Sequence, residues 1–352
     1  MSSTTAKLHR PEPCSAQGAQ PVDRDTPPHR AAQRLRDGTT LVVTDHYSTG
    51  AEIIARLQAL VPAPPLRAPY AQRQEHRRGL RRASLRLLAP IVDHRLALAG
   101  GAPIGLLAEL YPEQSRFWLP FVQVQELRGA WNRYREGVHL AVLGHRVHPY
   151  FGTYVPTRVE HLELFATWLS QYQGARAQGV DVGTGCGVLA LMLCRAGFAR
   201  VLATDQSPNA VESVARELQR LPPGVPLDLH QGDLLAQVSV QADLIVFNPP
   251  WVQGEREGLL DQALVFDDDL LPRFFDQASQ RLAPDGRVVV LFSNLIQLVQ
   301  PHLAHPILQE LEQDRFELVQ KLQRRVKPGV DARGRKRKTR EKVEVWELRM
   351  SG

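Results

Sequence analysis

Apolar runs and helical patterns alternate regularly in the chain after Pro156. Short, continuous apolar runs indicate buried strands, and apolar residues that recur every three to four positions indicate amphipathic helices. We expect strands at 180–182, 200–204, 227–230, 242–247 and 287–292, and helices at 158–169, 188–195, 208–218 and 270–282. This alternation predicts an α/β fold with a doubly wound parallel sheet.

The last two apolar runs, at 316–326 and 343–349, follow one another with no helical pattern between them. They are expected to pair as an antiparallel hairpin. If the first of them runs parallel to the earlier strands, the loop at 327–342 lies at the edge of the sheet where those strands end.

The part of the chain before residue 149 differs in composition and in its apolar pattern. Residues 1–38 are rich in Pro, Gln, Ser and Arg without an apolar period, and we expect them to be a disordered tail. Residues 39–148 are expected to form a smaller α+β domain, an accessory domain for substrate recognition. Its expected elements are strands at 41–43 and 139–143 and helices at 51–60, 71–88 and 124–134. Residues 149–352 are then the catalytic domain.

Composition limits the class of protein. The 352 residues are 43% apolar with a mean hydropathy of −0.26, and no apolar run reaches the roughly 18 residues of a membrane span. Neither a secretory signal nor a cysteine pair with metal-ligand spacing is found, so we expect a cytoplasmic protein without a metal site. The net charge of +6 favours a polyanionic partner, with positive charge concentrated at 72–86 and 327–342. The oligomeric state is left open.

A glycine-rich segment follows the first strand of the expected parallel sheet. Its residues are Gly183, Thr184, Gly185, Cys186 and Gly187, and Asp181 precedes it. Such a loop lets backbone N–H groups approach a ligand closely at the start of a helix. A nicotinamide or flavin site would have its third glycine at position 188, which is Val188, so an oxidoreductase is disfavoured. The tighter spacing suits a nucleoside with a zwitterionic tail.

Acidic residues follow the next two strands. Asp205 ends the second strand, where a carboxylate can accept hydrogen bonds from both hydroxyls of a ribose. Asp233 follows the third strand and could accept a hydrogen bond from an adenine amine. Because parallel strands end at one edge of the sheet, we expect both carboxylates to lie near the glycine loop.

The fourth strand runs directly into Asn248, Pro249, Pro250 and Trp251. The two prolines prevent a helix from starting there and stiffen the backbone. The Asn248 side-chain oxygen and the Pro249 carbonyl can accept the two hydrogens of an NH2 group while Trp251 stacks on its plane. This arrangement would orient the nitrogen lone pair toward a methyl group held on a sulfonium.

Together these motifs resemble the class I methyltransferases that carry N/D-P-P-Y/F/W after the fourth strand, the group of the small-domain methyltransferases. The resemblance covers roughly residues 149–352 and implies a Rossmann-like seven-stranded sheet and S-adenosylmethionine as cofactor. By the resemblance, the acceptor site comprises Asn248, Pro249, Pro250 and Trp251. The cofactor site comprises Asp181, Gly183, Thr184, Gly185, Gly187, Asp205 and Asp233, together with Asn248.

The acceptor is expected to be an exocyclic base amine in RNA. Seven basic residues between Lys327 and Arg340 are opposed only by Asp331 and Glu341, so this loop could lie along phosphates. The residues expected to bind substrate are Arg335, Lys336, Arg337 and Lys338.

Two alternatives remain open at this point. One is methylation of a protein glutamine on a translation-associated factor. Glutamine methyltransferases that act on release factors have P-R-P-E-T-E where this chain has the residues 156–160, PTRVE, which disfavours a release factor. The other is an RNA-binding protein whose methyltransferase domain is vestigial.

Overall fold

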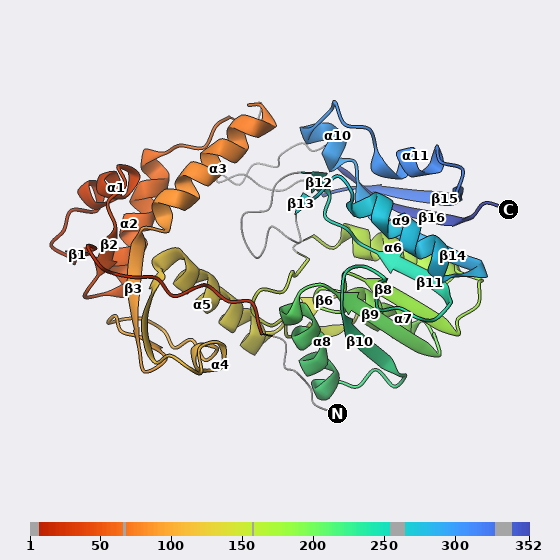
Figure 1. Ribbon diagram of the computed structural model, residues 1–352, viewed down its shortest axis with the longest axis horizontal. Helices are drawn as coiled ribbons and strands as arrows, with labels where there is room; N and C mark the ends of the chain where they lie inside the picture. Colours follow the sequence, from red (N-terminus) through yellow and green to blue (C-terminus); the bar gives the residue numbers. More distant parts are fainter. Residues whose placement is uncertain (1–6, 66–67, 157, 254–264, 328–339) are drawn as a thin grey trace. The chain divides into compact units, whose positions relative to one another are not determined.

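The computed structural model describes residues 7–65, 68–156, 158–253, 265–327 and 340–352. The chain divides into two compact units (Figure 1). The N-terminal unit is Arg10–Arg135, and the C-terminal unit comprises Glu136–Gly352 and the start of the chain up to His9. The backbone N–H of His9 donates to Asn209 Oδ1 at 2.7 Å, and the backbone oxygen of His9 accepts from Asn209 Nδ2 at 2.8 Å.

The C-terminal unit is built on a seven-stranded sheet with the strand order β10-β9-β8-β11-β14-β16-β15. Five neighbouring strands are parallel: β10 (Leu227–Gln231), β9 (Arg200–Asp205), β8 (Gln178–Val182), β11 (Ala242–Phe247) and β14 (Leu282–Ser293). The strand β16 (Lys342–Met350) is antiparallel to both β14 and the edge strand β15 (Phe316–Arg325). The predicted Rossmann-like sheet and its closing hairpin are therefore confirmed.

Two apolar cores cover the two faces of this sheet. Consecutive residues of β11 alternate between them: Leu244 and Val246 belong to one core, and Ile245 and Phe247 to the other. This is the period of two that a strand buried on both faces requires. The first core is packed by α6 (Glu160–Gln171) and α7 (Val188–Arg195), and the second by α9 (Leu270–Arg281). The unit also contains α8 (Pro208–Arg220), α10 (Leu295–Val299), α11 (Pro306–Leu311) and the short strands β12 (Val252–Gln253) and β13 (Val265–Phe266).

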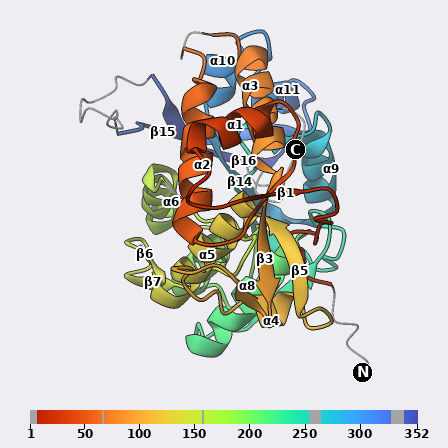
Figure 2. The same cartoon turned by 90° about the vertical axis from the view of Figure 1, so that its left-hand side faces the viewer.

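The N-terminal unit contains a five-stranded sheet. Its strands are β1 (Gln20–Val22), β2 (Leu41–Val43), β3 (Leu87–Val92), β4 (Arg95–Leu96) and β5 (Arg116–Pro120). Its helices are α1 (Pro28–Arg36), α2 (Tyr47–Leu60), α3 (Tyr70–Ser84), α4 (Leu107–Leu110) and α5 (Phe121–Glu136). Within this unit α1, α2 and α3 are neighbours (Figure 2). The α+β character predicted for this part of the chain agrees with these elements.

The prediction of a disordered tail at 1–38 is wrong for residues 7–38. The strand β1 pairs in parallel with β2, and α1 buries Ala31, Ala32 and Leu35, each 0% exposed. The apolar face of α1 consists of only three residues, two of them alanines, so the surrounding Arg and Gln residues conceal it in the sequence. Pro28 lies in the first turn, where its missing N–H is tolerated.

Two other boundaries differ from the prediction. The helix expected at 71–88 ends at Ser84, because Leu87 and Leu88 pair with β2 and are buried in β3. The strand expected near 139–143 is shorter, β6 (Val138–Leu140), and pairs with β7 (His145–Val147) across a turn in which the Leu143 N–H donates to the Leu140 carbonyl at 2.9 Å. In the part of the chain that the structure describes, no helix is long and apolar enough to cross a membrane.

Candidate active site

The glycine loop lies between the end of β8 and the start of α7. Gly183, Gly185 and Gly187 have φ values of +64°, +54° and +82°, a region that side-chain-bearing residues rarely adopt. A Cβ on Gly187 would lie 3.1 Å from Val214, and one on Gly183 would lie 3.3 Å from Phe247. The loop is therefore a tight turn that requires glycine at these positions.

Asp181, the penultimate residue of β8, stabilises this turn through its side chain. Its Oδ2 accepts hydrogen bonds from Thr184 Oγ1 at 2.7 Å and from the Ala190 N–H at 2.9 Å. The side chain is 0% exposed, and Oδ1 has no partner among the described residues. Burial raises the pKa of the carboxyl to about 7. Asp181 thus joins the glycine loop to the first turns of α7, and this geometry gives it a role in shaping the loop.

We expect Asp181→Asn to change how stability depends on pH. In the unfolded chain the carboxyl ionises near its ordinary value of 3.8, whereas its folded-state pKa is about 7. The folded state therefore loses stability as the pH rises from about 4 to about 7, since the unfolded chain releases its proton first. An asparagine oxygen can still accept from Thr184 and Ala190 but does not ionise. The melting temperature of the variant should thus gain on that of the wild type between pH 5 and pH 8, and a difference independent of pH would contradict this assignment.

Asp205, the last residue of β9, lies beside the glycine loop as predicted. Its Oδ2 accepts from the Gly185 N–H and its Oδ1 from the Ser207 N–H, both at 2.9 Å. Burial raises the pKa of the carboxyl, and these two hydrogen bonds oppose the rise. A carboxylate oxygen has lone pairs for more than one hydrogen bond, so each oxygen retains the capacity to accept a ligand hydroxyl.

The end of the third strand is held next to Asp205, because the Gly232 N–H donates to the Asp205 backbone oxygen at 3.0 Å. The side chain of Asp233 is half exposed and forms an ion pair with Arg273. A contact between Asp233 and an adenine amine stays a prediction.

The fourth strand end contains a polar group with no partner. Asn248 Oδ1 is buried and accepts no hydrogen bond from the described residues. Pro249, which follows it, is buried, and Trp251 is half-buried. The Trp251 indole N–H donates to the Leu291 carbonyl of β14 at 3.3 Å, which fixes the ring against the end of that strand. The structure therefore brings an unused acceptor oxygen and an anchored aromatic ring together at one strand end.

His161 is a residue of this region that the sequence did not single out. Its ring contacts Trp251 edge to face, with the ring centroids 5.1 Å apart and an interplanar angle of 89°. The side chain is 1% exposed and lies on α6 among apolar residues. A single histidine within an amphipathic helix resembles an ordinary core residue, so no local pattern distinguishes it.

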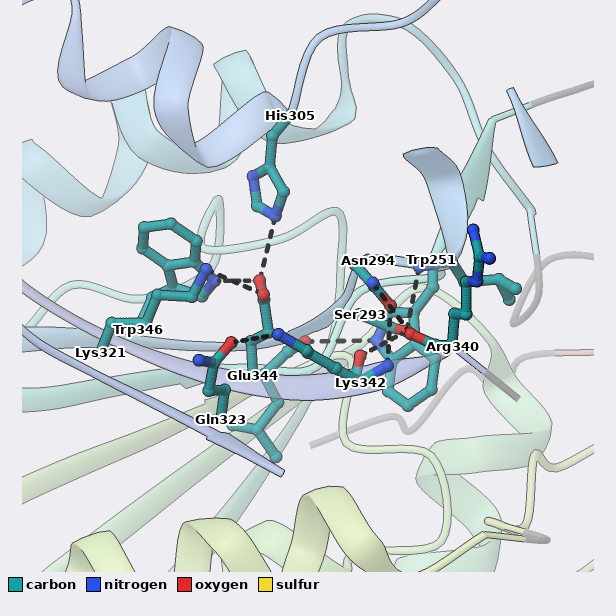
Figure 3. A network of polar contacts seen from close by, with 12 residues as sticks. Trp251, Ser293, Asn294, His305, Lys321, Gln323, Arg340, Lys342, Glu344 and Trp346 are labelled. Atoms are coloured by element: carbon teal, nitrogen blue, oxygen red, sulfur yellow. Dashed lines mark hydrogen bonds and ion pairs between the residues drawn. The ribbon is translucent and has the colours of Figure 1, made fainter. Parts of the chain in front are cut away.

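The two ends of the basic loop are held at the same edge of the sheet. The Lys327 N–H donates to Glu160 Oε1 at 3.0 Å, and the Lys342 N–H donates to Asn294 Oδ1 at 2.7 Å. Asn294 follows the end of β14, and Figure 3 shows it with Ser293, Lys342 and Trp251. The predicted substrate-binding residues Arg335, Lys336, Arg337 and Lys338 lie outside the described residues. Within the described ranges no group of His, Cys, Asp or Glu is arranged to hold a metal ion.

The strand order, the glycine loop and the Asn-Pro-Pro-Trp segment are those of the class I methyltransferase domain that the sequence predicted. Residues 162–315, which lie within the C-terminal unit, match the family model of the methyltransferase small domain.

Curated relatives that match stretches of this chain are named for different substrates. A 92-residue stretch, 26% of this chain, is 44% identical to the release factor glutamine methyltransferase of Deinococcus radiodurans and covers 32% of that protein. A 116-residue stretch, 33% of this chain, is 32% identical to the ribosomal RNA large subunit methyltransferase G of Alcanivorax borkumensis and covers 27% of it. Among solved structures, a ribosomal protein L11 methylase from Lactobacillus delbrueckii subsp. bulgaricus is 21% identical, with 59% of this chain and 87% of that chain covered and a TM-score of 0.41. The chain spans about a third to three fifths of the length of the first curated relatives that it matches.

Proposed function

We propose that this protein transfers a methyl group from S-adenosylmethionine to an exocyclic amine of an RNA base. The observation that supports the methyl-acceptor site is that Asn248 Oδ1 is buried and has no partner among the described residues, three positions before the anchored Trp251. A buried acceptor without a partner is rare in folded proteins, because it has lost its hydrogen bonds to water. An amine of the substrate would supply the missing donor.

The residues at the ends of β8 and β9 fit the proposed cofactor. The carboxylate of Asp205 would accept the ribose hydroxyls, and the backbone of Gly183, Gly185 and Gly187 would face the methionine tail, with no Cβ in the way. Asp181 and Thr184 would maintain the loop in this shape, and Asp233 would approach the adenine amine. When bound, the cofactor supplies an electrophilic methyl group on a positively charged sulfur.

The chain's own contribution to catalysis is orientation and electrostatics. Asn248 Oδ1 and the Pro249 carbonyl would accept the two amine hydrogens, which withdraws the nitrogen lone pair from conjugation with the base. Trp251 would stack on the base and fix its plane. With the lone pair aimed at the methyl carbon, an in-line displacement needs no strong general base, because the proton can leave after the methyl group has been transferred.

The N-terminal unit supports RNA as the acceptor. Residues 10–135 contain 18 arginines, no lysine and 11 acidic residues, a formal net charge of +7, although the whole chain carries only +6. The helix α3 carries Arg73, Arg77, Arg78, Arg81 and Arg82 and buries only its last two residues, Ala83 and Ser84. Arginine is the side chain best suited to bind phosphate through two parallel hydrogen bonds and to stack on bases.

We expect the basic loop to contribute to RNA affinity, although its central residues lie outside the described ranges. Replacing Arg335, Lys336, Arg337 and Lys338 by Gln should flatten the slope of log affinity against log salt concentration by about 0.7–0.9 for each phosphate that is no longer neutralised. Cofactor affinity should not change. Arg200→Gln is a matched control, because Arg200 begins β9 at the opposite edge of the sheet and is paired with Asp228. An unchanged slope in the fourfold variant would remove this loop from the RNA site.

Glutamine methylation is the second candidate function, favoured by the 44% identity to a release factor glutamine methyltransferase. A glutamine side chain presents the same planar NH2 group to Asn248. The vestigial alternative is disfavoured by the glycine loop, Asp205 and Asn248, which are all in place. Labelled S-adenosylmethionine added to lysate of a strain that lacks this protein separates the two acceptors. Label in the RNA fraction supports the proposed function, and label in the protein fraction alone rejects it.

A further inference from the structure

His161, the second residue of α6, has polar atoms that the folded chain does not use. Among the described residues neither Nδ1 nor Nε2 has a hydrogen-bond partner, although the side chain is only 1% exposed. Burial lowers the pKa of the imidazole to about 4, so the ring is neutral at physiological pH and carries one N–H donor and one acceptor. Two buried, unsatisfied positions on one ring call for a partner that is absent from the described part of the chain.

The position of this ring connects it with the acceptor site. The imidazole packs edge to face against Trp251, whose indole N–H is already used by the Leu291 carbonyl at 3.3 Å. Trp251 therefore has no donor left for a ligand. Among the described residues, both ring nitrogens of His161 and Asn248 Oδ1 are buried without a hydrogen-bond partner.

Contacts of neighbouring residues fix the first turn of α6, on which His161 lies. Glu160 accepts from the Lys327 N–H at 3.0 Å, and Glu163 is paired with Arg324 at 2.9 Å. The ring is thus placed by the helix and by its packing, not by hydrogen bonds of its own. Such an arrangement is typical of a side chain that is preorganised for a ligand.

We propose that His161 determines acceptor specificity in the proposed methylation site, where its imidazole hydrogen-bonds to the substrate atom next to the amine held by Asn248. This inference rests on the proposed function. In adenine and cytosine the exocyclic amine stands beside a ring nitrogen that accepts a hydrogen bond, and the N–H of a neutral imidazole supplies the donor. The site would then recognise two adjacent atoms of one base edge, the amine through Asn248 and its neighbour through His161.

The test is His161→Phe, because phenylalanine preserves an aromatic ring against Trp251 and removes both nitrogens. The probe is total RNA from a strain that lacks the protein, with labelled S-adenosylmethionine as donor. We expect kcat/KM for RNA to fall by about tenfold or more, the effect of losing one oriented hydrogen bond. Cofactor affinity should stay unchanged, and the melting temperature should not fall, since no hydrogen bond within the protein is removed. His161→Gln, which restores an N–H donor, should recover part of the lost kcat/KM.

His305→Phe provides the matched control. His305 is also buried, at 4% exposed, and packs on an indole, with its ring centroid 5.0 Å from that of Trp346. Unlike His161, it has a partner: its Nε2 lies 3.2 Å from Glu344 Oε2, and Figure 3 shows this contact. The same substitution at this site should lower the melting temperature and leave the KM for RNA unchanged.

Two results would overturn the inference. A lower melting temperature for His161→Phe would mean that the ring nitrogens have partners within the protein. Full methyl transfer by a stable His161→Phe variant would mean that they do not contact the acceptor. Failure of the proposed function is a separate result, because the wild-type protein would then label no RNA. If the wild type labels the protein fraction instead, kcat/KM of the wild type and of His161→Phe is compared with that protein fraction as acceptor. With either acceptor, the melting temperatures decide whether the His161 ring has partners within the protein.

Discussion

Asn248→Ala is expected to slow methyl transfer sharply and to leave cofactor affinity intact. Removing one oriented polar group from a transition state raises the barrier by roughly 2–4 kcal/mol, a fall in turnover of about 30- to 1000-fold. The fold should tolerate the change, because Asn248 Oδ1 accepts no hydrogen bond from the described residues. The measurements are single-turnover methyl transfer, cofactor titration and thermal unfolding of the same preparations.

Asn294→Ala is the matched control for this prediction. Asn294 also follows the end of a central strand, but its side chain is fully used: Oδ1 accepts from the Lys342 N–H at 2.7 Å, and Nδ2 donates to the Arg340 carbonyl at 3.3 Å. Asn294→Ala should therefore lower the melting temperature more than Asn248→Ala does. Near-normal turnover of Asn248→Ala on the natural acceptor would refute the proposed hold on the amine.

The sequence predicted the C-terminal sheet well, because each central strand is a continuous apolar run bounded by a recognisable turn. β11 is buried on both faces and ends at Asn248-Pro249-Pro250, so both its position and its end are visible in the chain. The glycine loop was equally visible, since three positive φ values require glycine at three fixed positions. The proximity of Asp205 to this loop followed from the parallel strand order, and the hydrogen bond to Gly185 confirms that proximity.

The features that could not be predicted depend on contacts between distant parts of the chain. The helix α1 packs against α2 and α3, which come later in the chain, and buries Ala31 and Leu35, although its own composition resembles that of a disordered tail. That the ring nitrogens of His161 and Asn248 Oδ1 have no partner among the described residues is likewise visible only in the folded chain. No single-sequence pattern shows which polar side chain will be buried without a partner.

Replacing Asp205 is expected to have the largest effect on cofactor binding. If its carboxylate accepts both ribose hydroxyls, Asp205→Ala removes two charge-assisted hydrogen bonds of roughly 1.5–3 kcal/mol each. The affinity for S-adenosylmethionine, measured by titration calorimetry, should fall by about a hundredfold or more. Because the alanine variant also leaves the Gly185 and Ser207 N–H groups without their acceptor, Asp205→Asn is the more informative change. It retains the shape of the side chain and one acceptor oxygen while it removes the charge.

A pH series separates the charge of Asp205 from its shape. Burial raises the pKa of this carboxyl, and only the ionised form accepts from both hydroxyls. Cofactor affinity of the wild type should therefore fall as the pH is lowered toward that raised pKa, because protons compete with the ribose for the carboxylate. Asp205→Asn should lose this dependence and bind weakly at every pH. Asp228→Asn is the control, since Asp228 lies on β10, where its side chain is paired with Arg200. If a folded Asp205→Asn variant bound the cofactor with wild-type affinity and the same pH profile, Asp205 would have no place in the cofactor site.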